Sequence, residues 1–144
     1  MQEQNYSNHA RYVPGFHFLL SGIIFLSLIG ACVNLYHSLN DHANLYSASL
    51  LVVVFVCLLI MYVYVRQFPL KAQDRAIRAE ENLRHFVMTG RMLDSRLTMR
   101  QVIGLRFASD EEFVELSKRA ANENLSEDQI KKTIKNWRPD NYRL

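Results

Sequence analysis

Two apolar runs without a charged residue lie close together near the start of the chain, at residues 16–36 and 46–65. Each run has about the ~20 residues that a helix needs to cross the hydrocarbon core of a bilayer. Residues 37–45 between them form a short, mostly polar loop. The pattern predicts a transmembrane hairpin over residues 16–65, with a short segment at 1–15 before it and a charged domain at 66–144 after it.

The basic residues around the two runs predict which way the hairpin crosses the membrane. The loop contains neither Lys nor Arg, whereas Arg11 precedes the first run and Arg66 and Lys71 follow the second. Because Lys and Arg concentrate in cytoplasmic flanks, both termini are predicted to be cytoplasmic and the loop external. One alternative stays open, since residues 29–32 resemble a lipoprotein cleavage box that would remove the first run and attach lipid to Cys32.

Small and polar residues lie on one face of the first predicted span. They are Ser27, Gly30, Ala31 and Asn34, which follow helical spacing. Small side chains at such a face let a neighbouring helix approach closely. We expect this neighbour to be the second span of the same chain, with a second copy of the protein as the alternative.

After Pro69 the apolar positions follow a heptad pattern, spaced alternately by four and three residues. The five positions are Ala72, Ala76, Ala79, Leu83 and Phe86; they are called the seam below. The spacing predicts a helix with one apolar side, which ends near Gly90. We expect the seam to be buried against the rest of the charged domain, with self-association through it as the alternative.

Three capping boxes, each a Ser or Thr followed three residues later by Glu or Gln, predict where further helices begin. The pairs are Thr98 with Gln101, Ser109 with Glu112, and Ser126 with Gln129. Helices are expected near 99–107, 110–123 and 127–138, with apolar residues at helical spacing. The fold class is therefore all-α: a two-helix transmembrane hairpin followed by a small cytoplasmic helical bundle.

The chain has a net charge of +3, and its basic residues suggest contacts with partners. The candidates for contact with a partner or with lipid are Lys71, Arg75, Arg78, Arg106, Lys131, Lys132, Lys135 and Trp137. For Lys131, Lys132, Lys135 and Trp137 the first interpretation is a helix face exposed to water. The alternative is that these residues contact anionic lipid. Nucleic acid is disfavoured, because no helix carries a dense basic recognition surface.

No pattern in the sequence indicates catalysis. Phosphate-binding glycine loops, zinc-type Cys/His clusters and nucleophile elbows are absent from the sequence. His37, Asp41 and His42 in the predicted outer loop could bind a transition metal, but short polar loops often contain such residues by chance. The expectation is a protein that is not an enzyme and that has no cofactor or metal.

Three stretches of the chain resemble a known family. Residues 4–14, 71–84 and 105–113 are similar to a family of small bacterial two-span membrane proteins, the domain of unknown function 6526. The likeness covers nearly the whole chain. It implies placement in the bacterial inner membrane and carries no activity and no catalytic residues.

These observations favour an accessory or scaffold protein of the inner membrane, which docks to a protein partner or to itself. Its function is expected to lie in residues 71–84 and 105–113, with Arg106 presented beside Asp110 and Glu111. Two alternatives stay open: a small transport or channel subunit formed by oligomerised hairpins, and a membrane-tethered regulator.

Overall fold

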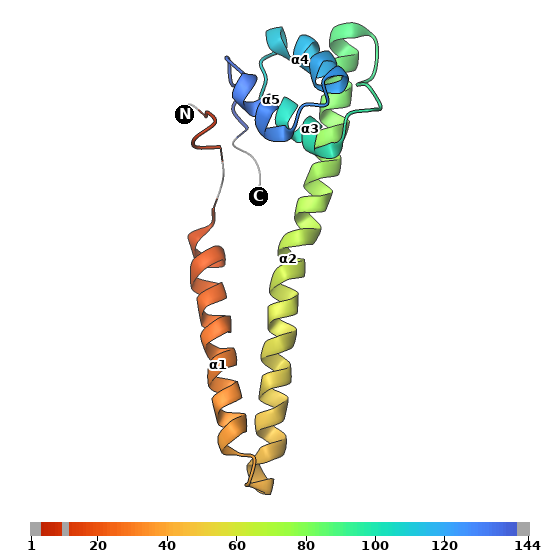
Figure 1. Cartoon of the computed structure of the whole chain (residues 1–144). Helices are drawn as coiled ribbons and strands as arrows, with labels where there is room; N and C mark the ends of the chain where they lie inside the picture. Colours follow the sequence, from red (N-terminus) through yellow and green to blue (C-terminus); the bar gives the residue numbers. More distant parts are fainter. Residues whose placement is uncertain (1–3, 10–11, 141–144) are drawn as a thin grey trace. The chain divides into compact units, whose positions relative to one another are not determined.

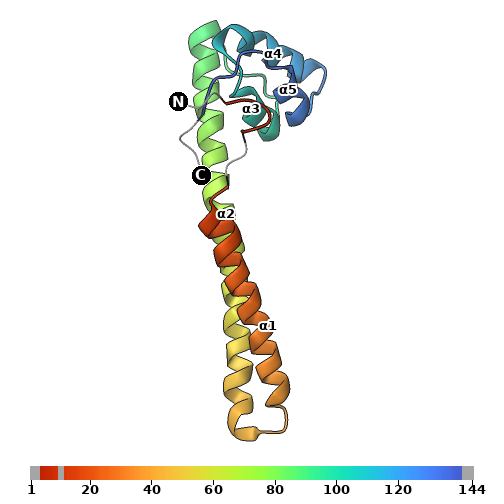
Figure 2. The same ribbon diagram turned by 90° about the vertical axis from the view of Figure 1, so that its left-hand side faces the viewer.

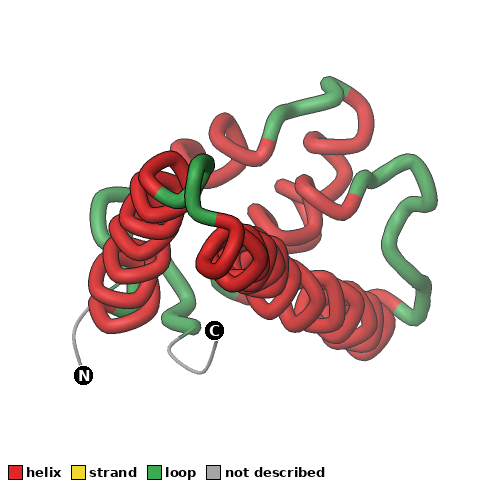
Figure 3. Tube along the Cα trace, turned by 90° about the horizontal axis from the view of Figure 1, so that it is seen from below, coloured by secondary structure: helices red, strands yellow, loops and turns green. Residues whose placement is uncertain are grey.

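The computed structural model of the chain describes residues 4–9 and 12–140, and its regular structure there is helical (Figure 3). The chain begins its regular structure with the π-helix η1 (Gly15–Leu20). The α-helices that follow, labelled in Figure 1, are α1 (Ser21–His37), α2 (His42–Thr89), α3 (Met99–Leu105), α4 (Asp110–Asn122) and α5 (Glu127–Thr133). The one β feature of the described residues is an isolated antiparallel bridge between Ala108 and Trp137. The predicted all-α class is confirmed for this part of the chain.

The chain divides into two compact units. The first comprises residues 12–68, with η1, α1 and the beginning of α2. The second joins the N-terminal segment to the residues from Pro69 onward, and it includes the end of α2 and the three short helices. Pro69 lies inside α2, where it removes one backbone donor without ending the helix. The second apolar run and the predicted helix after Pro69 are therefore one continuous helix.

In the first unit, the helical stretch Gly15–His37 and the beginning of α2 lie side by side (Figures 1 and 2). The rings of Phe16 and Tyr62 stack at a centroid distance of 4.5 Å, and the Tyr62 hydroxyl donates to the Phe16 carbonyl oxygen at 3.2 Å. Both helices are long and apolar enough to cross a membrane, judged by length and composition. The two apolar runs are thus helical, as predicted.

The inward side of α1 is rotated from the predicted one. Ile24, Ala31 and Ser38 are buried at heptad spacing, and only Ala31 of these belongs to the predicted face. Ser27, also of that face, is half-buried. Gly30 and Asn34 are exposed, and a Cβ added to Gly30 would meet no atom within 4 Å. The prediction assumed that small residues of α1 face the neighbouring helix. In the structure, the buried side of α1 contains both large and small side chains.

Two of the three predicted capping boxes are confirmed. The Thr98 hydroxyl accepts from the backbone N–H of Gln101 at 3.3 Å, and Gln101 Oε1 accepts from the N–H of Thr98 at 2.8 Å. Ser126 and Gln129 repeat this arrangement before α5. Each box satisfies backbone donors that the first turn of a helix leaves unpaired, which fixes where α3 and α5 begin.

The third predicted box is wrong. Ser109 is the N-cap of α4, but its hydroxyl makes no capping hydrogen bond and is buried without a partner among the described residues. The Glu112 carboxylate instead accepts from the backbone N–H groups of Lys135 at 3.1 Å and Asn136 at 3.3 Å. A tertiary contact with the segment after α5 has replaced the local cap.

Helix α5 ends at Thr133, earlier than the predicted range 127–138. Ile134 has an extended backbone, with a ψ of 124°. The following segment pairs with the loop after α3, where the N–H of Arg138 donates to the Phe107 carbonyl oxygen at 2.8 Å. These contacts supply the backbone partners that a longer helix would have supplied.

The three short helices and their loops enclose the core of the second unit. Its large, fully buried side chains are Leu97, Val102, Leu105, Phe107, Phe113 and Ile130. Helices α3 and α5 approach closely at Gly104, where an added Cβ would lie 3.2 Å from the Glu127 carbonyl oxygen and from Ile130 Cγ2. Ile77 of α2 joins this cluster, so the core covers one face of the final part of α2.

Candidate functional site

A charged network joins α2 to the short helices. Arg84 donates from Nη1 to Glu81 at 3.0 Å and from Nε to Asp110 at 2.8 Å. Its Nη2 donates to the Ala108 carbonyl oxygen at 2.8 Å, and the guanidinium lies 4.2 Å from the centroid of the Phe113 ring. Arg84 therefore holds the beginning of α4 against α2, and the charge of Asp110 is also favoured there by the helix dipole.

Glu81 is the buried carboxylate of this network, with 5% of its surface exposed. Its Oε1 lies 3.7 Å from Nη1 of Arg138, in addition to the bond from Arg84. Burial raises the pKa of Glu81 above its usual value, although the hydrogen bond and charge of Arg84 and the charge of Arg138 oppose this shift. With two arginines around it, this carboxylate has a structural role.

Arg106 does not stand beside Asp110, contrary to the sequence prediction. It is 9% exposed, its Nη1 lies 3.3 Å from Asp140, and its guanidinium lies over the Phe107 ring at 4.6 Å. Burial lowers the pKa of Arg106 from its usual value, against the charge of Asp140. Arg84 occupies the position beside Asp110 that was predicted for Arg106. It reaches α4 from α2, whereas the prediction considered only neighbours within residues 105–113.

The basic residues of α5 form ion pairs within the second unit. Lys131 is 9% exposed and its Nζ lies 2.6 Å from Glu127, while Lys132 pairs with Asp128 at 2.7 Å. Burial makes Lys131, like Arg106, unsuited to the surface contact predicted for it. The predicted contacts of Lys71, Arg75, Arg78, Lys132 and Lys135 stay predictions.

The N-terminal segment contributes residues that sequence reasoning missed. The His9 ring lies 5.9 Å from those of Phe107 and Trp137, and its Nε2 is 3.2 Å from Nζ of Lys131. Trp137 is half-buried and packs on Phe107 at the edge of the core, with ring centroids 5.0 Å apart, and its predicted contact with lipid stays a prediction. Residues 4–9 have no periodic pattern, and only their likeness to a family could have pointed to them.

The seam of α2 is exposed, so the expectation that it packs against the rest of the domain is wrong. Leu83 and Phe86 are 62% and 47% exposed, and the three alanines of the seam are exposed as well. The domain packs against Ile77 and Glu81. At ~100° per residue, Glu81 lies roughly 180° from Ala72, on the opposite side of the helix.

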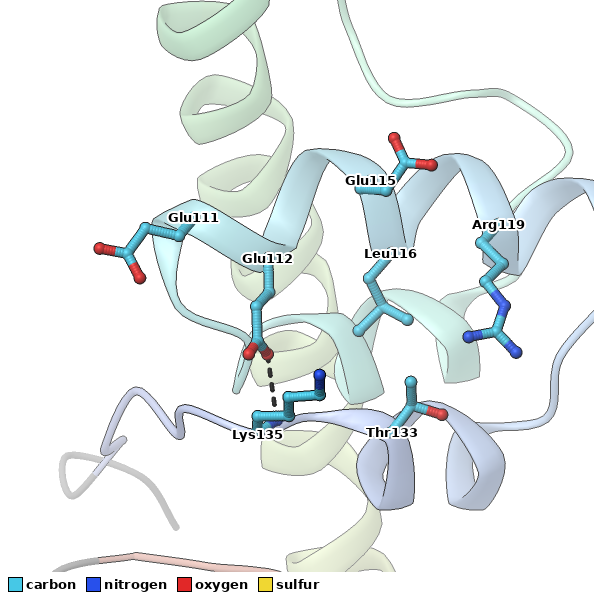
Figure 4. Close-up of a pocket in the computed structure, with 7 residues that line it drawn as sticks. All are labelled: Glu111, Glu112, Glu115, Leu116, Arg119, Thr133 and Lys135. Carbon is cyan, nitrogen blue, oxygen red and sulfur yellow. Dashed lines mark hydrogen bonds between the residues drawn. The ribbon is translucent and has the colours of Figure 1, made fainter.

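A groove of about 330 Å³ runs between α4 and the end of α5. Figure 4 shows Glu112, Leu116 and Arg119 pointing from α4 toward Thr133 and Lys135 across it, and two further acidic residues pointing away. The dashed line marks the hydrogen bond from the Lys135 N–H to Glu112. The Glu112 carboxylate holds the two sides of the groove together, because it accepts hydrogen bonds from the segment after α5.

The outer-loop residues proposed as metal ligands do not come together. No group of three metal-ligating side chains occurs in residues 4–9 and 12–140. Asp41 instead accepts from the N–H of Ala43 at 3.1 Å and from the amide of Asn44 at 2.6 Å, at the start of α2. Its carboxylate therefore acts as a helix cap, because a helix N-terminus leaves backbone donors unpaired.

Residues 1–144 match the family described as "Family of unknown function (DUF6526)". No curated protein and no solved structure matches the chain.

Proposed function

The chain belongs over its whole length to DUF6526, a family of unknown function, and we propose its function from its own residues. We propose that it is a non-enzymatic scaffold protein of a membrane. In this proposal the two apolar helices anchor it as a hairpin in the inner membrane of a bacterium. The second unit is held at the cytoplasmic surface, where it docks to a protein partner or to another copy.

The exposure of the two apolar helices carries this proposal. Only 11% and 6% of the residues in their most apolar windows are buried within the chain. A core helix of a water-soluble protein would be mostly buried, whereas a membrane span turns its apolar side chains toward lipid. A bilayer is the environment that covers two such helices.

The N-terminal segment supports the same-side placement of the two ends. The Tyr6 hydroxyl donates to Asp128, and His9 packs on Trp137, so residues before the first span contact residues after the second. Two spans return the chain to the side where it began, which allows this contact. Cleavage of the first run as a signal would remove Tyr6 and His9 from the protein, and so the contact disfavours it.

The charged residues of the second unit favour binding over catalysis. The arginines and carboxylates that lie inside it are engaged with one another, as in the set of Arg84 and Glu81. What the unit offers on its surface is the apolar seam of α2, with Leu83 and Phe86 exposed. An exposed apolar strip of this kind is typical of a surface that docks.

Cysteine labelling in whole bacterial cells tests the membrane anchor and its orientation. Cys32 and Cys57 are replaced by Ala, and single cysteines are placed in the loop (Asn40→Cys) or on α4 (Lys118→Cys). A membrane-impermeant maleimide should label Asn40→Cys in intact cells and Lys118→Cys only after lysis, while alkaline carbonate should leave the protein in the membrane. Release by carbonate, or equal labelling of both positions in intact cells, would overturn the proposal.

One observation favours a second candidate, a transport subunit of oligomerised hairpins. Gly30 and Asn34 form an exposed small and polar strip on an otherwise apolar helix. Such a strip allows close contact with another helix within the membrane. This candidate predicts flux through liposomes that contain the purified protein, and loss of that flux in Gly30→Leu. Absence of flux from liposomes with inserted protein would exclude it.

A further inference from the structure

We propose that the seam of α2 is a homodimer interface, in which two copies of this chain pack in parallel and in register as a short coiled coil. The proposal deepens the scaffold function and rests on it, because the bilayer supplies the common orientation of the two copies. The occupant of the seam is thus a second copy of the same chain.

The end of the seam nearest Gly90 is an exposed apolar surface of the second unit. Leu83 and Phe86 are 62% and 47% exposed, and the neighbouring Val87 is 76% exposed. Large side chains at heptad spacing on one side of a helix are what a coiled-coil partner covers. The residues that contact the chain's own short helices, such as Glu81, lie on the opposite side, so the bundle leaves this side open.

Lipid does not fit this surface. Leu83 lies about 18 Å further along the helix than Lys71, at ~1.5 Å per residue. The charged residues between them are Asp74, Arg75, Arg78, Glu80 and Glu81. Because charged side chains keep this part of the helix in water, the apolar seam beyond them requires a protein partner.

The charges beside the seam select a parallel pair of copies. With Ala76 and Leu83 at the a positions and Phe86 at a d position, Arg75 occupies position g and Glu80 the following position e. In a parallel coiled coil, position g of one chain faces the next e of its partner, which gives two symmetric pairs of opposite charge. An antiparallel pair would place like charges together, because g then faces g and e faces e.

Arg75 and Glu80 have no ion-pair partner among the described residues of their own chain, and Glu80 is exposed. They are therefore available to a second copy. The alanines near Pro69 let two helix backbones come close, while Leu83 and Phe86 fill the wider end. The seam is too short to hold two free helices together, and tethering to one bilayer raises the effective concentration of the partner.

Disulfide trapping in lipid vesicles tests the register. In the full chain with Cys32 and Cys57 replaced by Ala, one cysteine is introduced at a seam position (Ala79→Cys) or at its neighbour outside the seam (Arg78→Cys). Because insertion in one bilayer gives the two copies the same orientation, residue 79 of one copy comes within disulfide distance of its counterpart when the parallel helices are in register. Oxidation should give at least about tenfold more covalent dimer with Ala79→Cys than with Arg78→Cys, because disulfides require Cβ atoms roughly 4 Å apart.

Charge reversal tests the partner's identity independently. Arg75→Glu or Glu80→Arg alone places like charges opposite each other and should lower the trapped dimer of the Ala79→Cys protein by roughly fivefold. The double variant with both changes restores the opposite charges and should restore the dimer. Both positions are on the surface, so these changes leave the folded core intact.

Three outcomes would overturn the homodimer. They are a monomer in vesicles at all seam positions, equal trapping at residues 78 and 79, and failure of the double charge reversal to restore the dimer. Carbonate extraction of the same vesicles shows whether the protein is inserted. An inserted monomer would refute the dimer and leave the membrane scaffold standing, whereas release by carbonate would refute the proposed function itself.

Discussion

Arg84 of α2 and Asp110 of α4 are joined by two hydrogen bonds to one carboxylate oxygen, from Nε at 2.8 Å and from Nη2 at 2.5 Å. The side chain of Arg84 is 10% exposed, whereas that of Asp110 is 74% exposed. Arg84 is thus the buried member of the pair, and Asp110 is the solvent-exposed one. It links the two stretches, 71–84 and 105–113, to which the sequence analysis assigned function, and it gives both of them a part in holding the fold.

Removal of Arg84 should destabilise the second unit strongly. Arg84→Ala leaves the buried carboxylate of Glu81 without its nearest cation, and breaking a buried pair in this way costs about 3–5 kcal/mol. Asp110→Asn should cost about 1 kcal/mol or less, because that carboxylate is exposed. The measurement is amide hydrogen exchange of α3–α5 in the full-length protein, which reports the free energy of opening.

Arg75→Ala is the matched control for this experiment. Arg75 is an exposed arginine of the same helix and has no ion-pair partner in the part of the chain that the structure describes. Its removal should change the stability of the monomer by no more than about 0.5 kcal/mol. Equal losses in Arg84→Ala and Arg75→Ala would contradict the role given to the buried network.

The raised pKa of Glu81 predicts a pH dependence of stability. Burial is the main cause of the shift, and the pKa lies above the usual value of 4.5. Between the usual and the raised value the folded protein binds more protons than the unfolded chain, so this contribution to stability is complete below pH 4.5 and is lost as the pH rises through the raised pKa. In Glu81→Gln this downward slope should disappear from thermal unfolding curves.

Asp94 provides a control of the opposite sign. Its hydrogen bonds with Arg96 lower its pKa from 3.8 to about 2. The contribution of Asp94 is therefore present above pH 3.8 and lost as the pH falls through about 2. Asp94→Asn should therefore lower the unfolding temperature above pH 3.8, and this difference from the unsubstituted protein should vanish as the pH falls through about 2. A loss of stability in Glu81→Gln that likewise grows with rising pH would contradict the assignment of Glu81.

The buried hydroxyl of Ser109 predicts that this cap residue is dispensable. Ser109→Ala removes a polar group that has no hydrogen-bond partner within residues 4–9 and 12–140, so the change in the free energy of unfolding should be about zero or slightly stabilising. Thr98→Ala and Ser126→Ala each remove a working capping box and should cost about 1 kcal/mol. The free energy of unfolding is measured with denaturant. A similar loss in all three variants would indicate that Ser109 caps α4, as the sequence predicted.

The local part of the fold could be predicted from the sequence because local chemistry determines it. The caps at Thr98 and Ser126 fix the starts of two helices, and Gly90, with a φ of +71°, ends α2 where an L-residue would be strained. Helices α3 and α4 lie within the predicted ranges 99–107 and 110–123. The apolar runs are helical for the same reason, since their length and composition suffice.

The tertiary part could not be predicted, because its partners are remote in sequence. Glu112 left its predicted cap for backbone groups of the segment after α5, and Arg84 displaced Arg106 beside Asp110. The heptad spacing located the seam correctly on one side of α2, but it does not say whether the chain itself covers that side. The inward side of this part of α2 is formed by residues between the seam positions, because Ile77, Glu81 and His85 are the buried ones.

The contact of His9 with Trp137 predicts a direct optical test of the N-terminal segment. Trp137 is the only tryptophan of the chain, and the His9 ring lies 5.9 Å from it. Tyr6→Ala together with His9→Ala should uncover the indole, shift its emission to longer wavelength and destabilise the second unit by about 1 kcal/mol. His42→Ala, at the start of α2, is the matched control and should leave the emission unchanged. An unshifted spectrum in the double variant would show that the segment does not cover Trp137, and would remove one support for placing both ends on the same side.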